Sequence, residues 1–143
     1  MKRQNDFENY TNKQKAIDRA LWLNFEYRLT HQRFVVVPSC ESGYYVVPNG
    51  HPCFEEEEIE ELSCGYSDLT YLDIQHIRAD CDQLSHWEEI IGMFTVMNGE
   101  ILRFILHYGI PLEKLIRYEL ACRGHDKEHK WVGFDKAKEI WLK

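Results

Sequence analysis

Carboxylates are the most abundant ionisable side chains in the middle of this chain. The sixty residues from Glu41 to Glu100 contain fourteen Asp and Glu residues and one cation, Arg78. Residues 1–40 carry seven Lys and Arg against four Asp and Glu, and residues 101–143 carry nine against six. The middle therefore has a formal charge of −13 in a chain of net charge −7. A surface of this polarity attracts cations and basic proteins and repels phosphate backbones.

The acidic residues of the middle segment are the candidate partner-binding residues. An acidic surface with aromatic anchors is a ligand for a basic groove, and Tyr66, Tyr71 and Trp87 supply such anchors. The alternative is that these carboxylates only keep a small protein soluble. The candidate residues are Glu55, Glu56, Glu57, Glu58, Glu60 and Glu61, with Asp68, Asp73, Asp80 and Asp82 as support.

Cysteine and histidine offer a second chemistry, the binding of a metal ion. A structural zinc site uses closely paired ligands, typically two cysteines separated by two to four residues. Successive cysteines here are 13, 11, 17 and 41 positions apart, and the tightest mixed pair is His51-Pro-Cys53, which Cys40 and Cys64 could complete. This spacing is unspecific, so we predict no metal site and no cofactor.

Signatures of catalysis are missing from the sequence. There is no Gly-x-Ser-x-Gly for a nucleophile and no Gly-x-Gly for a phosphate loop. We therefore predict no catalytic residue and a non-enzymatic protein. The alternative is a divalent-metal-dependent hydrolase of nuclease type that uses Asp80 and Asp82, although Asp80-Cys-Asp82 lacks the loop glycine of a cation site.

A third alternative is a DNA-binding regulator that uses residues 99–123. This segment resembles a helix–turn–helix in outline, and its second helix carries Lys114, Arg117 and Arg123. The first turn of that helix, after Pro111, has few polar side chains that could read bases, and the net charge opposes phosphate-driven affinity. We therefore do not expect direct binding of nucleic acid.

The pattern of apolar residues predicts a mostly helical α+β single domain, 1–143, with one small antiparallel β-hairpin. A helix is expected over residues 12–31, with Ile17, Leu21, Phe25 and Leu29 on one face, which Ala16, Ala20 and Trp22 widen. Two β-branched runs predict a hairpin over 34–48. The acidic segment 54–62 is either a short helix or a loop. Helices are expected to fill residues 67–142, with starts at Ser67 or Asp68, at Ser85 within a capping box, at Pro111, and after Asp135.

Length and composition predict a protein of the cytoplasm. The first residues contain no apolar stretch typical of a signal peptide, and no apolar run approaches the roughly 20 residues that cross a bilayer. We expect no membrane association, and reduced thiols at the five cysteines.

The acidic middle, the helical α+β pattern and two C-terminal stretches together resemble the accessory proteins of phages and mobile elements, including anti-CRISPR and other anti-defence inhibitors. The stretches are Arg117-Tyr-Glu-Leu-Ala-Cys-Arg-Gly-His-Asp126 and Trp131-Val-Gly-Phe-Asp-Lys-Ala-Lys-Glu-Ile-Trp-Leu142. The resemblance covers the last third of the chain and contains no functional motif. It implies a protein-binding inhibitor of a basic nucleic-acid-handling protein, such as a CRISPR–Cas effector, and it assigns no binding residue.

Overall fold

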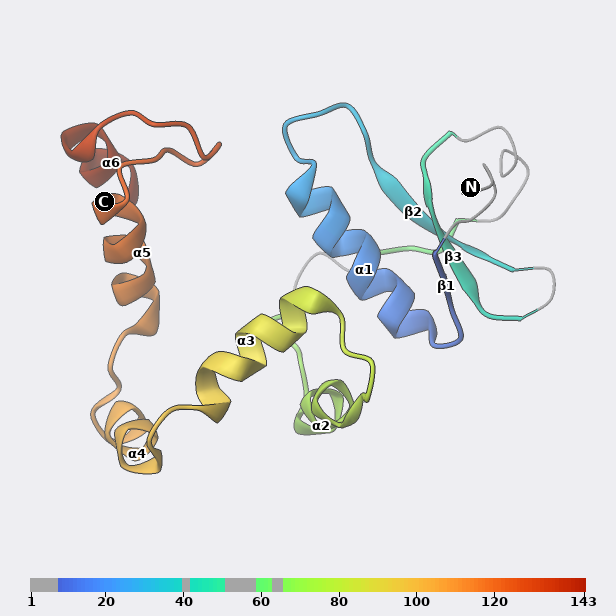
Figure 1. The fold of residues 1–143 in the computed structure, drawn as a ribbon, viewed down its shortest axis with the longest axis horizontal. Coiled ribbons are helices and arrows are strands. Elements are labelled where there is room, and N and C mark those ends of the chain that lie inside the picture. The colour runs from blue at the N-terminus through green and yellow to red at the C-terminus, as the bar shows by residue number, and fades with distance from the viewer. Residues whose placement is uncertain (1–7, 40–41, 51–58, 63–65) are drawn as a thin grey trace. The chain divides into compact units, whose positions relative to one another are not determined.

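The computed structural model describes residues 8–39, 42–50, 59–62 and 66–143. Within these residues the chain forms six helices and a three-stranded antiparallel sheet, which confirms the predicted mostly helical α+β class (Figure 1). The chain divides into two compact units, Met1–Gly92 and Met93–Lys143.

The sheet belongs to the first unit and has the strand order β1-β3-β2. Strands β2 (Phe34–Pro38) and β3 (Tyr44–Pro48) form the predicted hairpin, and each ends at its proline, which cannot donate to the ladder. Strand β1 (Glu8–Tyr10) pairs with β3 and was not predicted. Its three residues are too few to show the alternation of apolar and polar side chains that identifies a strand.

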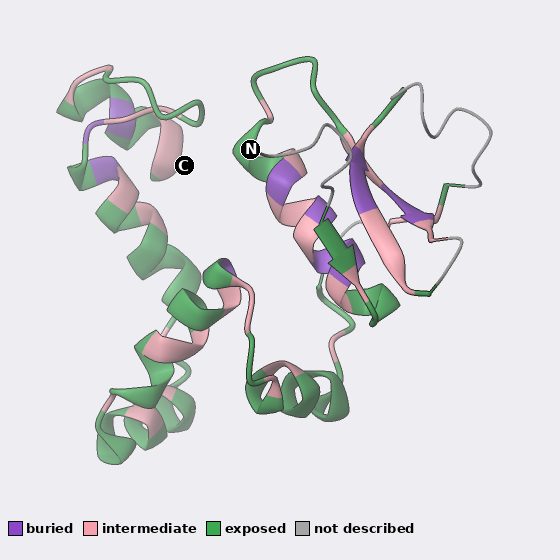
Figure 2. Ribbon diagram, turned by 45° about the vertical axis from the view of Figure 1, so that its right-hand side comes forward, coloured by how far each residue is buried: buried purple, intermediate pink, exposed green. Residues whose placement is uncertain are grey.

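Helix α1 (Lys13–Glu26) packs against this sheet and completes the core. The Asn12 side chain caps the helix by accepting hydrogen bonds from the Gln14 and Lys15 backbone N–H groups at 2.8 and 3.2 Å. The core, drawn as buried in Figure 2, is formed by residues of α1 and of the two hairpin strands. Its buried members are Ala16, Ile17, Ala20, Leu23, Val36 and Val46.

The predicted helix over 12–31 was too long, and the C-terminal part of its apolar face was wrongly expected to be buried. The helix ends at Glu26, and Thr30 then closes a turn by donating its backbone N–H to the Tyr27 carbonyl at 3.0 Å. Phe25 and Leu29, expected inside, are 57 % and 58 % exposed. Ile17, Ala16 and Ala20 are buried as expected, and the two alanines allow the helix backbone to approach the sheet closely.

Two further helices complete the first unit. Helix α2 (Tyr71–Ala79) begins at a capping box between Thr70 and Asp73, so the predicted caps at Ser67 and Asp68 were wrong. Helix α3 (Ser85–Thr95) begins where predicted, but the Glu88 N–H donates to the Leu84 carbonyl at 3.0 Å, so the cap position is Leu84. The division between the two units falls within α3.

Only the end of the acidic segment 54–62 lies among the described residues. Residues 59–62 are not helical, and Glu60 forms an isolated antiparallel bridge with Val36 of β2. The Glu60 N–H donates to the Val36 carbonyl at 2.8 Å.

The second unit contains α4 (Gly99–Tyr108), α5 (Leu112–Cys122) and α6 (Phe134–Trp141). Gly109 ends α4 in the left-handed conformation, as its position in the sequence predicts. Helices α5 and α6 pack together through buried Ala121 and Ala137.

The cap predicted for α6 was wrong by two positions. Gly133, at φ +90°, precedes the helix, and Asp135 lies in its first turn. The carboxylate at Asp135 still complements the positive end of the helix dipole.

Candidate functional site

A cavity of about 780 Å³ opens in the first unit, beside the N-terminal half of α1. Its walls come from α1, the segment before α2, α2 itself, the loop between α2 and α3, and Trp87 of α3. It contains three of the six described acidic residues that the sequence singled out. The lining residues with ionisable or aromatic side chains are Lys15, Asp18, Tyr66, Asp68, Asp73, His76, Asp80 and Trp87.

Helix α1 aims one face at the sheet and the adjoining face at the cavity. Ala16, Ala20 and Leu23 pack toward the strands. Gln14 and Asp18, four positions apart and therefore on one side of the helix, line the cavity together with Lys15. The cap at Asn12 fixes the first turn, from which Gln14 and Lys15 project, and Asp18 follows one turn later.

Asp18 is the central polar group of the cavity, and only 5 % of it is exposed. Its Oδ1 atom accepts hydrogen bonds from Gln14 Nε2 at 3.0 Å and from the Tyr66 hydroxyl at 3.1 Å. Burial raises the pKa of the Asp18 carboxyl, although the polar groups of Gln14, Tyr66 and Trp87 favour its charged form.

Tyr66 and Trp87 form an aromatic wall of the cavity. Their ring centroids are 5.4 Å apart, and the rings meet edge to face at 81°. Burial and the nearby charge of Asp18 raise the pKa of the Tyr66 hydroxyl, so the hydroxyl remains a hydrogen-bond donor at neutral pH.

Behind this wall, His86 stacks on Trp22 of α1 with centroids 5.0 Å apart and rings inclined by 5°. His86 is 8 % exposed, and burial lowers its pKa. Within the described part of the chain, neither His86 Nδ1 nor Trp87 Nε1 has a hydrogen-bond partner. The stack holds the start of α3, and with it Trp87, against α1.

Among the described residues that line the cavity, Lys15 carries the single ammonium group, and this group is already paired. Its Nζ atom lies 2.7 Å from Asp80 Oδ2 and donates to the Asp82 carbonyl at 2.5 Å. The hydrogen bond from Lys15 is the main reason why the pKa of Asp80 is lowered. Lys15 therefore ties α1 to the loop between α2 and α3.

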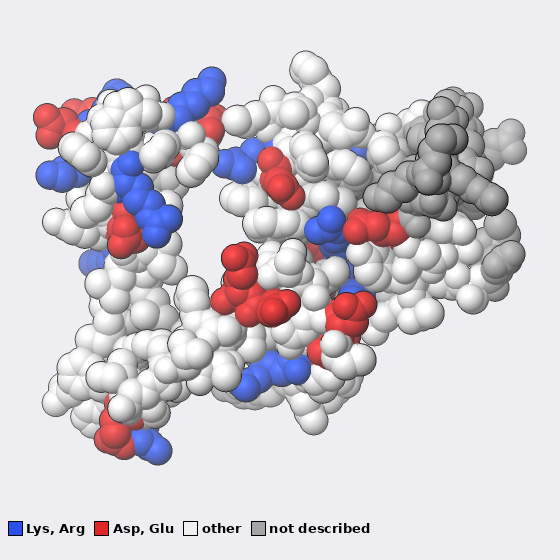
Figure 3. Space-filling model, viewed as in Figure 1, with Lys and Arg blue, Asp and Glu red and all other residues white. Residues whose placement is uncertain are grey.

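The other two carboxylates of the lining, on Asp73 and Asp68, differ in their surroundings. Asp73 accepts the Thr70 N–H at 2.9 Å, and this hydrogen bond lowers its pKa. Asp68 is exposed and forms no ion pair with any described residue. With Asp18 and Asp80, the lining holds four carboxylates against the one ammonium of Lys15, a formal charge of −3. Figure 3 shows groups of carboxylate atoms over the first unit, with Lys and Arg atoms beside several of them.

The structure brings only some of the predicted binding residues together. Asp68, Asp73 and Asp80 line the cavity, whereas Asp82 contributes its backbone carbonyl to Lys15. Glu60 lies elsewhere and pairs with Lys13 at 2.8 Å, and Glu61 is exposed. The four remaining predicted residues lie outside the described residues. These are Glu55, Glu56, Glu57 and Glu58.

Asp18 is the functional candidate that the sequence analysis missed. It lies within the segment Ala16-Ile-Asp-Arg-Ala20, where apolar positions of the helix are buried on both sides of it. A carboxylate at the edge of an apolar helix face is an available signal, because a buried charge is costly without partners.

The metal-site candidates gain no support from the described residues. No three side chains of His, Cys, Asp or Glu within the described ranges are grouped to hold a metal ion. The sequence candidates Cys40, His51, Cys53 and Cys64 lie outside those ranges. Asp80, the carboxylate of the proposed hydrolase, is held by Lys15.

The cations of residues 99–123 are largely engaged within their own helices. Arg117 pairs with Glu113, and Arg123 pairs with Glu119, each at 3.2 Å. Arg103 pairs with Glu100 in the same way. These pairs offset the positive charge that a DNA-binding face would present.

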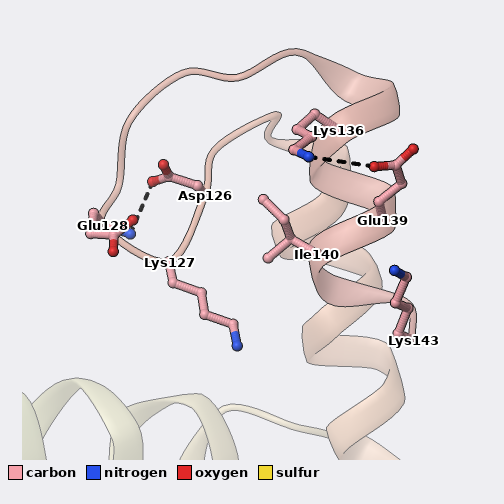
Figure 4. Close-up of a pocket in the computed structure, with 7 residues that line it drawn as sticks. All are labelled: Asp126, Lys127, Glu128, Lys136, Glu139, Ile140 and Lys143. Atoms are coloured by element: carbon pink, nitrogen blue, oxygen red, sulfur yellow. Dashed lines mark hydrogen bonds and ion pairs between the residues drawn. The ribbon is translucent and has the colours of Figure 1, made fainter.

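A second, smaller hollow of about 400 Å³ lies in the second unit (Figure 4). Three carboxylates and three lysines line it around Ile140, so it has no net charge. The Asp126 side chain stabilises the turn in which it lies, because its Oδ1 atom accepts hydrogen bonds from the backbone N–H groups of Glu128 and Lys130, both at 2.9 Å. Lys136 and Glu139 form an exposed ion pair at 3.6 Å. This balanced and open surface selects no ligand.

No protein-family model, curated protein sequence or solved structure matches this chain. Among the described residues, no single helix has the length and hydropathy needed to cross a membrane. Helices α3 and α4, which are separated by a bend, reach that length and hydropathy only when they are counted together.

Proposed function

We propose that this chain is a non-enzymatic binding protein that inhibits a basic, nucleic-acid-handling protein, with the acidic cavity of the first unit at the centre of the contact. One observation carries the proposal: the described residues that line the cavity include four carboxylates and one ammonium group, on Lys15, which is already paired. The aromatic wall of Tyr66 and Trp87 adds the kind of side chain that dominates protein interfaces.

The charge of the site favours such a partner for a physical reason. A protein that handles nucleic acid carries Lys and Arg in a groove that neutralises phosphates. An acidic surface attracts that groove over long range and competes with nucleic acid for it. A CRISPR–Cas effector, with its positively charged channel, is a partner of this kind. An inhibitor of this type acts in the cytoplasm, where its target works.

The proposal is tested by capture of the partner. Tagged protein is incubated with lysate of the native host, with and without nuclease treatment, and bound proteins are identified by mass spectrometry. The proposal requires a nucleic-acid-binding protein in both samples, and the nucleic acid of that protein must displace it from the tagged chain. Recovery only without nuclease would instead indicate that the chain binds nucleic acid itself.

The two alternative functions remain distinguishable from this proposal. A hydrolase requires a divalent-dependent activity that is lost in Asp80→Asn or Asp82→Asn. A DNA-binding regulator requires salt-sensitive binding of duplex DNA by the isolated protein. The ion pairs of Asp80, Arg117 and Arg123 within the protein favour neither alternative.

A further inference from the structure

The second unit, Met93–Lys143, has almost no apolar core of its own. All of its residues are described, and the apolar ones that are buried are Ala121 and Ala137, where α5 packs against α6. A unit this small rarely buries enough apolar surface to remain folded alone. Helix α4 has no buried residue and makes no extensive contact with α5 or α6. Isolated helices shorter than about 12–15 residues are marginal in water, so α4 needs a further surface to pack against.

Helix α4 carries an apolar face that is open to solvent. Ile101, Phe104 and Tyr108 recur three and four positions apart and therefore lie on one side of the helix. Their exposed fractions are 48 %, 51 % and 68 %. The rings of Phe104 and Tyr108 meet edge to face, with centroids 5.2 Å apart. Within the second unit, no other element covers this face.

Helix α5 presents a second apolar face, on the side turned away from α6. Ala121 marks the side that packs on α6, and Leu112, Leu115 and Ile116 lie on the opposite side of the helix. These three residues are 39 %, 56 % and 58 % exposed. Figure 2 shows α4 and most of α5 in the colour of exposed residues.

The two faces together have the size of a protein interface. Only residues 109–111 separate the helices, and we call the six side chains the helical apolar surface: Ile101, Phe104, Tyr108, Leu112, Leu115 and Ile116. At roughly 150–250 Å² for a large side chain, these six expose on the order of 600 Å². Leu106 and Tyr118, which are 84 % and 57 % exposed on the same helices, raise the area to on the order of 800 Å². A stable interface buries about 800 Å² on each chain.

The charges around this surface fit a second copy of the chain better than the basic partner proposed for the first unit. Residues 93–143 carry nine Lys and Arg against seven Asp and Glu, so they do not attract a basic protein. Charged residues of α4 and α5 form pairs that a second copy would not repel. These pairs are Glu100–Arg103, Glu113–Arg117 and Glu119–Arg123.

We infer that the chain forms a homodimer through α4 and α5, in which the helical apolar surface of one copy covers the same surface of the other. A two-fold axis brings the same patch of both chains together, so one self-complementary surface is sufficient. The shared core supplies the burial that Ala121 and Ala137 alone do not. This inference does not depend on the proposed function, because the acidic cavity belongs to the first unit.

The first test measures the mass of the full chain in solution. Sedimentation equilibrium is recorded from nanomolar to high micromolar concentrations, and we expect twice the chain mass of 17.1 kDa at the high end. Hydrogen exchange is followed on the same samples. Amides of α4 should be protected in the dimer and exchange faster on dilution to monomer, whereas α1, which has its own core, should not respond. A monomer at every concentration would overturn the inference, whether or not α4 is protected.

Substitutions on the two helices locate the interface. Phe104→Glu and Leu115→Glu each place a charge in the helical apolar surface, and Leu29→Glu is the matched control at an equally exposed leucine of the first unit. We expect each surface variant to raise the dissociation constant of the dimer at least about a hundredfold, because an unpaired charge would be buried. The control should dimerise like the unaltered protein. A dimer that persists in both surface variants would contradict the assignment.

A conservative variant and a lipid control separate loss of the interface from other causes. Leu115→Met keeps an apolar side chain of similar volume and should retain the dimer. Failure of Leu115→Met and Leu29→Glu to dimerise would show that any substitution disrupts the dimer, and it would remove the support for this surface. Vesicles of neutral phospholipid test a membrane as the occupant. A chain that stays monomeric and gains α4 protection only on these vesicles would overturn the inference.

Discussion

The Tyr66 hydroxyl donates a hydrogen bond of 3.1 Å to Oδ1 of Asp18, which joins two residues that are 48 positions apart in the sequence. The bond couples the loop before α2 to α1, and it sets the position of one aromatic ring in the wall of the cavity. The same two side chains thus stabilise the first unit and shape its candidate binding site.

Tyr66→Phe is expected to lower the free energy of unfolding by about 1.5 kcal/mol or more, because it removes a hydrogen bond to a carboxylate that remains buried. Tyr71→Phe is the control, since Tyr71 is 92 % exposed and should change little. Urea denaturation of both variants and of the Tyr66→Phe, Asp18→Asn pair gives the coupling energy. A coupling energy of zero would show that the hydrogen bond contributes nothing in solution.

Asp18→Asn tests the cost of the buried charge. Because the pKa of Asp18 is raised in the folded state, the folded protein holds this proton more tightly than the unfolded chain. Its contribution to stability therefore falls as the pH rises from the unfolded pKa through the folded one, and the cost is complete above both. We expect the stability of Asp18→Asn relative to the unaltered protein to increase with pH across that window. Urea midpoints measured between pH 4 and pH 7 test the sign, and a difference that is constant with pH would contradict it.

His86 has the opposite dependence on pH. Burial lowers its pKa, so the unfolded chain binds the proton more readily, and stability is lost as the pH falls below the unfolded value of about 6.5. His86→Phe keeps a ring against Trp22 and removes the proton site, so it should retain stability at pH 7 and lose less between pH 6.5 and pH 5. His86→Gln should also reduce the loss of stability between pH 6.5 and pH 5, but it should lower stability at every pH because it loses the stack on Trp22. The same acid loss in both variants as in the unaltered protein would exclude His86 as its source.

Asp80 and Asp82 allow the Lys15 ion pair to be tested by two neighbouring substitutions. The pKa of Asp80 is lowered, so its contribution to stability is present above the unfolded pKa and is lost as the pH falls through the folded one. Asp80→Asn should cost about 1 kcal/mol at pH 7, because the pair with Lys15 is partly exposed. Asp82→Asn removes the charge of a side chain that forms no ion pair with any described residue, and it should cost much less. Equal effects would show that the pair is not formed in solution.

Two glycines with positive φ test the second unit. Gly109 and Gly124 have φ angles of +61° and +73°, so an alanine at either costs about 1 kcal/mol of backbone strain. A Cβ atom at Gly109 meets no atom within 4 Å, whereas one at Gly124 overlaps the Trp131 ring. The ring can move only by losing its edge-to-face contacts with His125 and Phe134. Hydrogen exchange of α5 amides should show Gly124→Ala to be the more destabilising by about 1 kcal/mol. Equal protection would place the Trp131 ring elsewhere.

The local elements were largely predictable from the sequence, because their signals are local. Gly109 ends α4, and the prolines end β2 and β3, as expected. The periodicity of α1 identified Ala16, Ile17 and Ala20, but it did not show that Phe25 and Leu29 are exposed, since the sheet that covers the helix is formed by other segments of the chain.

The cavity could not be predicted from sequence patterns for the same reason. The acidic composition indicated the region, and Asp68, Asp73 and Asp80 were named from it. Nothing in the spacing of Asp18 and Tyr66 shows that α1 and the loop before α2 meet. Charge density along the chain also directed attention to the glutamate run 55–58, whereas the grouping around the cavity depends on the tertiary fold.

The central claim is that the acidic cavity binds a basic nucleic-acid-handling protein. The most direct measurement is the dissociation constant of the captured partner for the unaltered chain and for the double variant Asp18→Asn, Asp68→Asn, at several salt concentrations. The control is Glu128→Gln, Glu139→Gln, which removes the same charge from the second unit. We predict that the cavity variant binds at least about tenfold more weakly at low salt and depends less on salt, while the control matches the unaltered protein. Equal affinities and equal salt dependence for all three proteins would contradict the claim.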